Sequence, residues 1–177
     1  MKIFKIFCAF RDGVISAISK SNCGKLSHIL RYGLYKNLLK CIGDDVLFGQ
    51  GIIIKEPEKV SVGNHVSIQE NCYISGYGGV SIGNHVSIGN GTKIVSSEHD
   101  YNSGKIIRNN PLVAKEVIIE DNVWVGMGVI ILGGTHICEH SIIAAGAVVK
   151  GVVESDSIYA GVPARLVKKI ESVRERK

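Results

Sequence analysis

The sequence is poor in several residue types, and each shortage excludes a class of protein. Its 177 residues include three prolines, too few for a collagen-like or proline-rich disordered chain. The five cysteines are an odd set with irregular spacing and no CxxC motif, which argues against a disulfide framework or a zinc site. No apolar run approaches the length of about 18 residues that a membrane-spanning helix needs. Lys5 and Arg11 interrupt the apolar start, so we expect no signal peptide and a cytoplasmic location.

Basic charge is concentrated at the start of the chain. Residues 1–40 hold eight Lys and Arg and one acidic residue, whereas the remainder holds 13 basic and 15 acidic residues. This segment fits a solvated helical face, or an arm that contacts a membrane or another anionic polymer. We expect it to form one or two short helices over the open end of the main domain, because apolar residues recur there at helical spacing: Leu26, Ile29, Leu30, Leu34, Leu38 and Leu39. No nucleic-acid partner is expected.

Aliphatic residues recur every six positions through most of the chain. The leading positions are Ile42, Phe48, Ile54, Val62, Ile68, Ile74, Ile82, Ile88, Ile94, Ile119, Val125, Ile131, Ile137, Ile143 and Val149. Neither the helical period of 3.6 nor the period of 2 of a flat strand explains this spacing. Three hexads would close a coil of about 18 residues, with coils stacked about 4.8 Å apart. The repeat therefore predicts an all-β fold, a parallel β-helix.

A second inward position follows four residues after each leading residue and holds smaller side chains, such as Val66, Thr92 and Ala147. Between the two positions lie residues that tolerate a positive φ and would turn the corners: Asn64, Asn84, Gly91, Asn122, Gly134 and Gly146. Segments 54–61 and 74–81 run for eight residues instead of six. We therefore expect a two-residue bulge at a corner of each, with Gly78-Gly79 forming the second.

A polar insertion at residues 95–116 interrupts the repeat between Ile94 and Ile119. Long polar insertions in a compact repeat fold are usually functional, so we expect a protruding loop that carries part of a site. The chain then divides into a helical segment at 1–40, a β-helix domain at 41–170 and a basic tail at 171–177.

Four sequence features together carry a family resemblance. The first is the hexad repeat, and the second is the SSEHDY motif at 96–101 within the insertion. The third is VIIEDNVWVG at 117–126, where the repeat resumes, and the fourth is AGAVVK at 145–150 followed by SIYAGVPARLVKK at 157–169. With these motifs, residues 42–170 resemble the hexapeptide-repeat acyltransferases, in the branch of sugar, polysaccharide and xenobiotic O-acetyltransferases. The resemblance implies a left-handed β-helix, a homotrimer, and acetyl-CoA bound between adjacent subunits.

His99 is the candidate catalytic residue. Acetyl transfer from a thioester to a hydroxyl needs a base for the hydroxyl proton and an acid for the leaving thiolate. A neutral imidazole can serve as both near pH 7. Of the six histidines, His99 alone lies in the insertion, where the resemblance places the catalytic histidine. Glu98, Asp100 or a backbone carbonyl could orient its ring.

The remaining candidates are binding residues. The resemblance implies that four residues line the pantetheine arm of acetyl-CoA: Trp124, Gly126, Ala145 and Gly146. Three basic side chains at the end of the β-helix domain are candidates for the CoA phosphates, because phosphate favours Arg and Lys: Arg165, Lys168 and Lys169. Aligned with the family, the acceptor-side residues are Gln69, Asn71 and Tyr77. Gln69 and Tyr77 depart from the Asn and Asp common in relatives, which argues against a simple galactoside or maltose acceptor.

The leading hypothesis is direct O-acetylation of a sugar of a surface polysaccharide or its precursor, with no metal. The alternatives are N-acetylation of an amino sugar, acetylation of an antibiotic, and a β-helix scaffold with a vestigial CoA site. His99, His136 and His140 resemble the three-histidine metal set of the γ-class carbonic anhydrases. Their loose spacing, Trp124 and the GVPAR tail argue against that interpretation.

Overall fold

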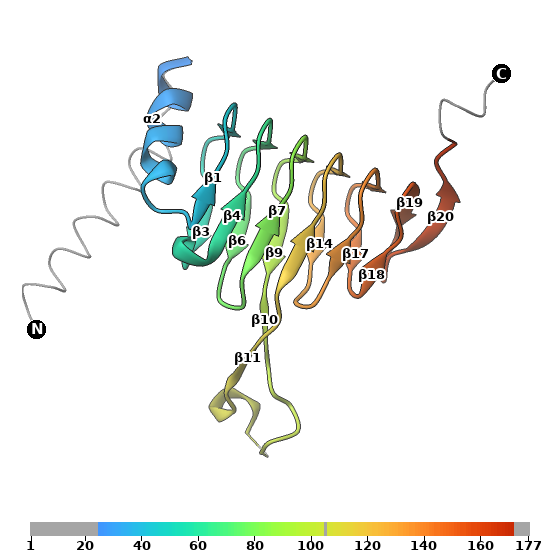
Figure 1. The fold of residues 1–177 in the computed structure, drawn as a ribbon. Helices are drawn as coiled ribbons and strands as arrows, with labels where there is room; N and C mark the ends of the chain where they lie inside the picture. Colours follow the sequence, from blue (N-terminus) through green and yellow to red (C-terminus); the bar gives the residue numbers. More distant parts are fainter. Residues whose placement is uncertain (1–24, 105, 172–177) are drawn as a thin grey trace, which may run out of the picture.

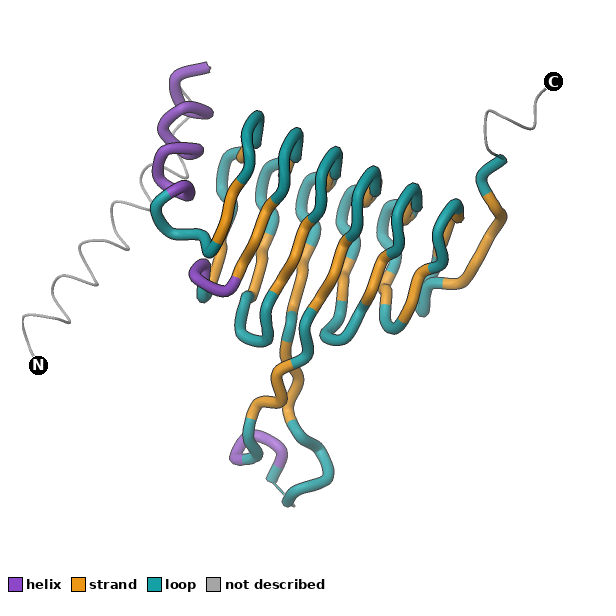
Figure 2. The backbone as a smooth tube through the Cα atoms, in the orientation of Figure 1, coloured by secondary structure: helices purple, strands orange, loops and turns teal. Residues whose placement is uncertain are grey.

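The computed structural model describes residues 25–104 and 106–171, in which the chain winds into a stack of coils (Figures 1 and 2). Each complete coil gives one strand to each of three parallel sheets, so the stack has three faces and three corners. Helix α2 lies at one end, β19 and β20 lie at the other, and a hairpin projects from the side. The predicted parallel β-helix with a helical N-terminal segment and a protruding loop is confirmed.

The three sheets run along the stack, and each is named here by its place in a coil. The first sheet holds β1 (Cys41–Ile42), β4 (Val60–Val62), β7 (Val80–Ile82), β12 (Val117–Ile119), β15 (His136–Ile137) and β18 (Val152–Val153). The second sheet holds β2 (Leu47–Phe48), β5 (Ser67–Ile68), β8 (Ser87–Ile88), β13 (Trp124–Val125), β16 (Ile142–Ile143), β19 (Ser157–Ala160) and the antiparallel β20 (Arg165–Lys169). The third sheet holds β3 (Ile53–Lys55), β6 (Tyr73–Ser75), β9 (Lys93–Val95), β14 (Ile130–Ile131) and β17 (Val148–Val149).

Apart from the coil that carries the hairpin, where Val80 pairs with Val117, the coil length shortens along the stack. Paired residues are 20 positions apart between β1 and β4, 18 apart between β12 and β15, and 16 apart between β15 and β18. The longer early coils contain the two expected bulges, a 3₁₀ turn at Pro57–Lys59 and a turn at Gly79, where φ is 96°. The last coil is shorter because Gly151, with φ of 86°, turns the chain so that Val153 points inward four residues after Val149.

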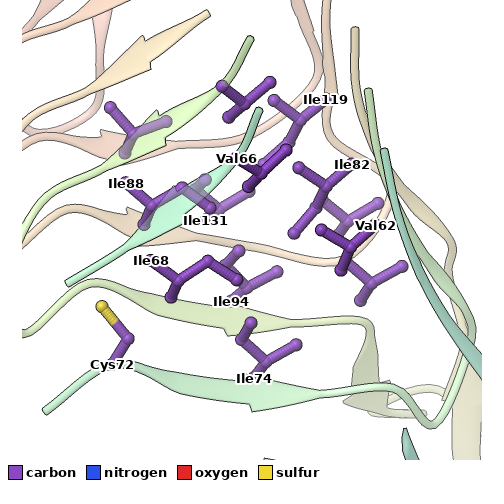
Figure 3. Close-up of a cluster of buried hydrophobic side chains, with 14 of the residues drawn as sticks. Val62, Val66, Ile68, Cys72, Ile74, Ile82, Ile88, Ile94, Ile119 and Ile131 are labelled. Atoms are coloured by element: carbon purple, nitrogen blue, oxygen red, sulfur yellow. The ribbon is translucent and has the colours of Figure 1, made fainter. Parts of the chain in front are cut away.

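The aliphatic side chains of the repeat fill the interior of the stack (Figure 3). Ile42 and Ile54 are partly buried, and the other thirteen leading residues are buried. The smaller residues four positions later are buried too, including Cys72, Thr92 and Ala147. Burial of apolar area on this scale, at roughly 25 cal/mol per Å², is the main stabilising term of the fold.

Helix α2 (Lys25–Lys36) covers the open end of the first coil and satisfies its backbone. The buried Arg31 donates from Nε to the Phe48 carbonyl at 2.7 Å, and the Tyr35 hydroxyl donates to the Ile52 carbonyl at 3.2 Å. Tyr35 also packs its ring against Phe48, with the ring centres 4.6 Å apart. The two side chains thus satisfy backbone carbonyls of the first coil, which has no preceding coil to pair with.

Parts of two predicted segments lie outside the described residues. Most of the basic arm falls in residues 1–24, and most of the tail falls in residues 172–177. The proposed domain boundaries therefore stay predictions. Within the described ranges, no helix is long and apolar enough to span a membrane.

The prediction that Asn64 and Asn84 have positive φ is wrong. At these corners His65 and His85 take the left-handed conformation, with φ of 55° and 56°, and their rings stack 4.8 Å apart. The asparagine side chains instead join successive coils by accepting hydrogen bonds at Oδ1 from the coil before. Asp44 N–H donates to Asn64 Oδ1 and Asn64 N–H donates to Asn84 Oδ1, both at 2.9 Å. Gly91, Asn122, Gly134 and Gly146 have positive φ as predicted.

Candidate active site

His99 lies at the end of β10, on the hairpin that leaves the coil stack. β10 (Ser97–His99) pairs with β11 (Leu112–Ala114), and the hairpin projects from the corner between the third and first sheets (Figure 1). The imidazole is exposed, and its Nδ1 lies 3.4 Å from the Asn110 carbonyl. Because a carbonyl can only accept, this contact favours the neutral tautomer with its proton on Nδ1, in which Nε2 is unprotonated. That is the form a general base needs.

The Asn110 carbonyl is itself held within the hairpin. The Asn110 side chain donates to the Asp100 carbonyl at 2.6 Å, and the Asp100 N–H donates to the Pro111 carbonyl at 3.0 Å. The Asp100 carboxylate accepts from the Asn102 N–H at 2.8 Å, which lowers the pKa of Asp100. Of the orienting groups left open by the sequence, the backbone carbonyl is therefore the one beside the ring.

Glu98 ties the base of the hairpin to the coil stack. Its carboxylate accepts from the ammonium of Lys115 and, at 3.4 Å, from that of Lys150. The Lys115 hydrogen bond lowers the pKa of Glu98, and the same bond raises the pKa of Lys115. Lys115 precedes β12, and Lys150 follows β17, so the network extends along this corner past the intervening turn between β14 and β15. Sequence reasoning missed it, because Lys115 lies in the insertion, outside the repeat that places Lys150.

Tyr77 is the one acceptor-side candidate at this corner. It lies in the turn between β6 and β7, next to Gly78, whose N–H donates to Ser96 Oγ at 2.9 Å where the hairpin begins. The Lys59 ammonium lies 5.2 Å from the centre of the Tyr77 ring and donates to its carbonyl at 3.0 Å. Tyr77 and His99 therefore form a first group of candidates, at the hairpin corner.

Trp124 belongs to a second group, on the outer face of the second sheet. Trp124 is the one tryptophan of the chain and lies on β13. It is 57% exposed, which is unusual for so large an apolar side chain. Ala145 and Gly146 are exposed at the corner between the second and third sheets, where Gly146 has φ of 72°. Gly126 is buried, and a Cβ there would lie 2.6 Å from Ala145 N. The close approach of the next coil therefore accounts for a glycine at position 126 without any bound ligand.

Gln69 and Asn71 lie with the second group, and so are separated from Tyr77. Gln69 follows β5 in the second sheet, and Asn71 turns the next corner with φ of 58°. Beside them Asn90 Nδ2 donates to the Glu70 carboxylate at 2.5 Å. The three acceptor-side candidates therefore occupy two different corners of one chain.

The basic candidates lie on β20, the last strand of the second sheet. All three side chains are exposed, but they differ in their contacts. Lys169 Nζ lies 2.5 Å from the Glu154 carboxylate, which raises the pKa of Lys169. Arg165 donates to the adjacent Ala164 carbonyl at 2.9 Å, and no acidic partner is described for it. Arg165 is therefore better placed than Lys169 to bind an added phosphate.

The two groups lie on opposite sides of one chain. In a three-sided stack, the corner between the third and first sheets points away from the second sheet, so His99 and Trp124 cannot face a common ligand. The three histidines of the carbonic anhydrase alternative are also separated. His136 lies on the first sheet, and His140 pairs with Asp156 at 2.7 Å at the corner between the first and second sheets.

Comparison with known proteins fits this architecture. Residues 116–151 match the family model for the bacterial transferase hexapeptide (six repeats). This stretch of the chain is therefore similar to the hexapeptide-repeat transferases. The fold is similar to a hexapeptide-repeat acetyltransferase of Vibrio cholerae solved with acetyl-CoA, at a TM-score of 0.79 and 24% identity over 92% of this chain and 86% of that one. It is also similar to a galactoside acetyltransferase solved with coenzyme A, at a TM-score of 0.82 and 20% identity over 92% and 80%. At these identities the likeness establishes the fold, and the left-handed β-helix is confirmed.

Among curated proteins, a 67-residue stretch is 39% identical to the 2,3,4,5-tetrahydropyridine-2,6-dicarboxylate N-acetyltransferase of Staphylococcus aureus. The stretch covers 38% of this chain and 28% of that enzyme. The chain thus spans little more than a quarter of the curated relatives it matches. The match shows relationship in the repeat region rather than along whole proteins.

Proposed function

We propose that this protein is an acetyl-CoA-dependent O-acetyltransferase that acts on a sugar of a surface polysaccharide or its precursor. The observation that carries the proposal is the state of His99, an exposed imidazole on a projecting hairpin with Nδ1 facing the Asn110 carbonyl. That arrangement offers Nε2 as a base to a ligand outside the coil stack. The acetyl-CoA and coenzyme A in the similar structures support the choice of donor.

The transfer needs one histidine and no covalent enzyme intermediate. His99 Nε2 takes the acceptor hydroxyl proton while the oxygen attacks the thioester carbonyl of acetyl-CoA. The tetrahedral intermediate then expels the CoA thiolate, which receives the proton from the His99 imidazolium. The products are the acetyl ester and free CoA, and the imidazole returns to its starting state.

The proposed active form is a homotrimer with sites between subunits. Within one chain His99 and Trp124 lie on opposite sides of the stack, so a second chain is needed to bring the hairpin of one subunit to the second sheet of the next. Trp124 and Met127 leave apolar surface exposed on the second-sheet side, as a binding surface would. Arg165 and Lys168 on β20 would then contact the CoA phosphates.

N-acetylation of an amino sugar is the second candidate. Besides the Staphylococcus aureus N-acetyltransferase, the fold is similar to an N-acyltransferase of Bacillus cereus solved with dTDP-4-amino-4,6-dideoxyglucose and coenzyme A, at a TM-score of 0.63. The same base would remove a proton from an ammonium acceptor. The two candidates therefore differ in the acceptor atom, which is a hydroxyl oxygen in the first and an amine nitrogen in the second.

The deciding experiment follows thiol release from acetyl-CoA with neutral sugars, amino sugars and oligosaccharides as acceptors. Wild-type protein should acetylate hydroxyls, and His99→Ala should lower kcat by about 10²–10⁴-fold with little change in the KM for acetyl-CoA. His85→Asn is the matched control, because Asn tolerates the positive φ of this exposed corner. Near-normal turnover in His99→Ala would refute the assignment, and transfer to amines alone would favour the second candidate.

A further inference from the structure

Three side chains with metal-binding groups meet on the outer face of the first sheet. The buried Ile137 separates His136 from Cys138, so both of these side chains point outward. The pairing of Ile118 with His136 and of Ile119 with Ile137 places Glu120 opposite Cys138 on the adjacent strand. One ligand atom from each of Glu120, His136 and Cys138 lies within 4.8 Å of the others. This face carries none of the residues assigned to acetyl transfer.

The Glu120 carboxylate is already held in position. Its Oε1 lies 2.6 Å from His136 Nε2, and its Oε2 accepts the Glu139 N–H at 2.9 Å. The contact keeps the carboxylate and the imidazole side by side, and a zinc ion would replace the proton that joins Oε1 to Nε2. The third, Cys138, is half-buried and carries no disulfide.

The donor set selects one class of cation. Thiolate and imidazole favour Zn²⁺ and similar transition metals, whereas Mg²⁺ and Ca²⁺ favour sites built from oxygen ligands alone. The charge also suits a divalent cation, since the Glu120 carboxylate and a Cys138 thiolate together carry two negative charges that the ion would balance. We propose that Glu120, His136 and Cys138 bind one zinc ion, with water completing a tetrahedral site.

The site would link two successive coils. Glu120 follows β12, and His136 and Cys138 belong to the β15 strand and its end, so one ion would join coils that otherwise pair through the backbone. Ligands drawn from both coils make the site dependent on the folded state, and zinc should therefore stabilise the protein. The role is structural, and it is independent of the proposed acetyl transfer.

A cobalt titration of chelator-treated full-length protein tests the site. Co²⁺ occupies zinc sites, and a thiolate ligand gives it a charge-transfer absorption that imidazole and carboxylate do not. The wild-type protein should bind one Co²⁺ per chain with this band, and Cys138→Ser should abolish it. His136→Asn and Glu120→Gln should weaken binding about tenfold or more. Zinc should also raise the Tm of the wild-type protein but not that of Cys138→Ser.

Two variants serve as matched controls. Cys41→Ser removes an exposed thiol elsewhere on the first sheet. His140→Asn removes a histidine that also pairs with a carboxylate, at similar exposure, and Asn tolerates its positive φ. Both should bind Co²⁺ as the wild type does. A thiolate band that survives Cys138→Ser, or a wild-type Tm that zinc does not raise, would overturn the proposal.

Discussion

The coil stack and the hairpin it carries are built on opposite principles. In the stack, inner strands pair with a strand above and below, and aliphatic side chains such as Ile94 and Ile131 are fully buried. In the hairpin, β10 and β11 pair only with each other, and Ile106, Ile107 and Leu112 are exposed. Stability is therefore concentrated in the repeat, while the segment that breaks the repeat is held by few contacts and carries the candidate base. We therefore expect the stack to fold without the hairpin, whereas the hairpin depends on the stack for its anchoring.

Removing the hairpin tests that independence most directly. Replacement of residues 98–113 with Asn-Gly, which favours a tight turn, would join Ser97 to Ala114, which are paired in the structure. Acetyl transfer should fall at least as far as in His99→Ala, by about 10²-fold or more, because the base is lost. Circular dichroism should show the same β-helix with a similar Tm. Loss of the folded state in this variant would show that the hairpin supports the stack.

The next largest effect is on stability, from matched truncations in the two regions. Ile131→Ala, in the core, should lower the free energy of unfolding by about 2–5 kcal/mol through lost burial and the cavity left behind. Leu112→Ala, on the 42% exposed side chain in β11, should change it by about 0.5 kcal/mol or less. Denaturant unfolding of both variants at one protein concentration measures the difference. Equal destabilisation would mean that the hairpin shares the core's stability.

The same contrast explains how much the sequence could predict. The residues of the core could be predicted from a short repeat, since the aliphatic residue at every sixth position must point inward for the coil to close. Asn64 and His65 show its limit, because both tolerate a positive φ and only the hydrogen bonds between coils decide which residue turns. The repeat also could not predict the 16-residue last coil, which depends on a single turn at Gly151.

The candidate site was less predictable than the fold. Its residues could be proposed one by one, but their separation into two groups depends on which corner or face each hexad occupies. Glu98, Lys115 and Lys150 meet only because the hairpin returns to the corner it left. The Glu120, His136 and Cys138 cluster likewise requires the register between β12 and β15. Such contacts join residues of different coils, so a short local sequence pattern does not reveal them.

A smaller effect separates two basic residues on opposite sides of the stack. Arg165→Ala should raise the KM for acetyl-CoA about tenfold, as loss of a charge-assisted phosphate contact would. Lys150→Ala should leave it within about twofold, because the lysine contacts Glu98 at the hairpin corner and a surface charge contact contributes little. Steady-state kinetics of both variants with one acceptor give the comparison. If Lys150→Ala were the more damaging, Lys150 would contact CoA and the proposed binding side would be wrong.

The smallest effect concerns the pH dependence of the tether between the two regions. Lys115 lowers the pKa of Glu98 below its ordinary value of 4.5, so the tether stabilises the attached hairpin at pH values above 4.5. That contribution should disappear as the pH falls through the lowered pKa, and also as the pH rises through the raised pKa of Lys115, above 10.5.

At neutral pH, Glu98→Gln should speed amide hydrogen exchange in β10 and β11 by about twofold to fivefold, since an exposed ion pair contributes little. Glu116→Gln is the matched control, because its carboxylate lies 3.4 Å from Ser81 Oγ on the coil stack. The difference between wild type and Glu98→Gln should shrink at acidic pH, and a difference that stayed constant would show that the carboxylate does not hold the hairpin through its charge.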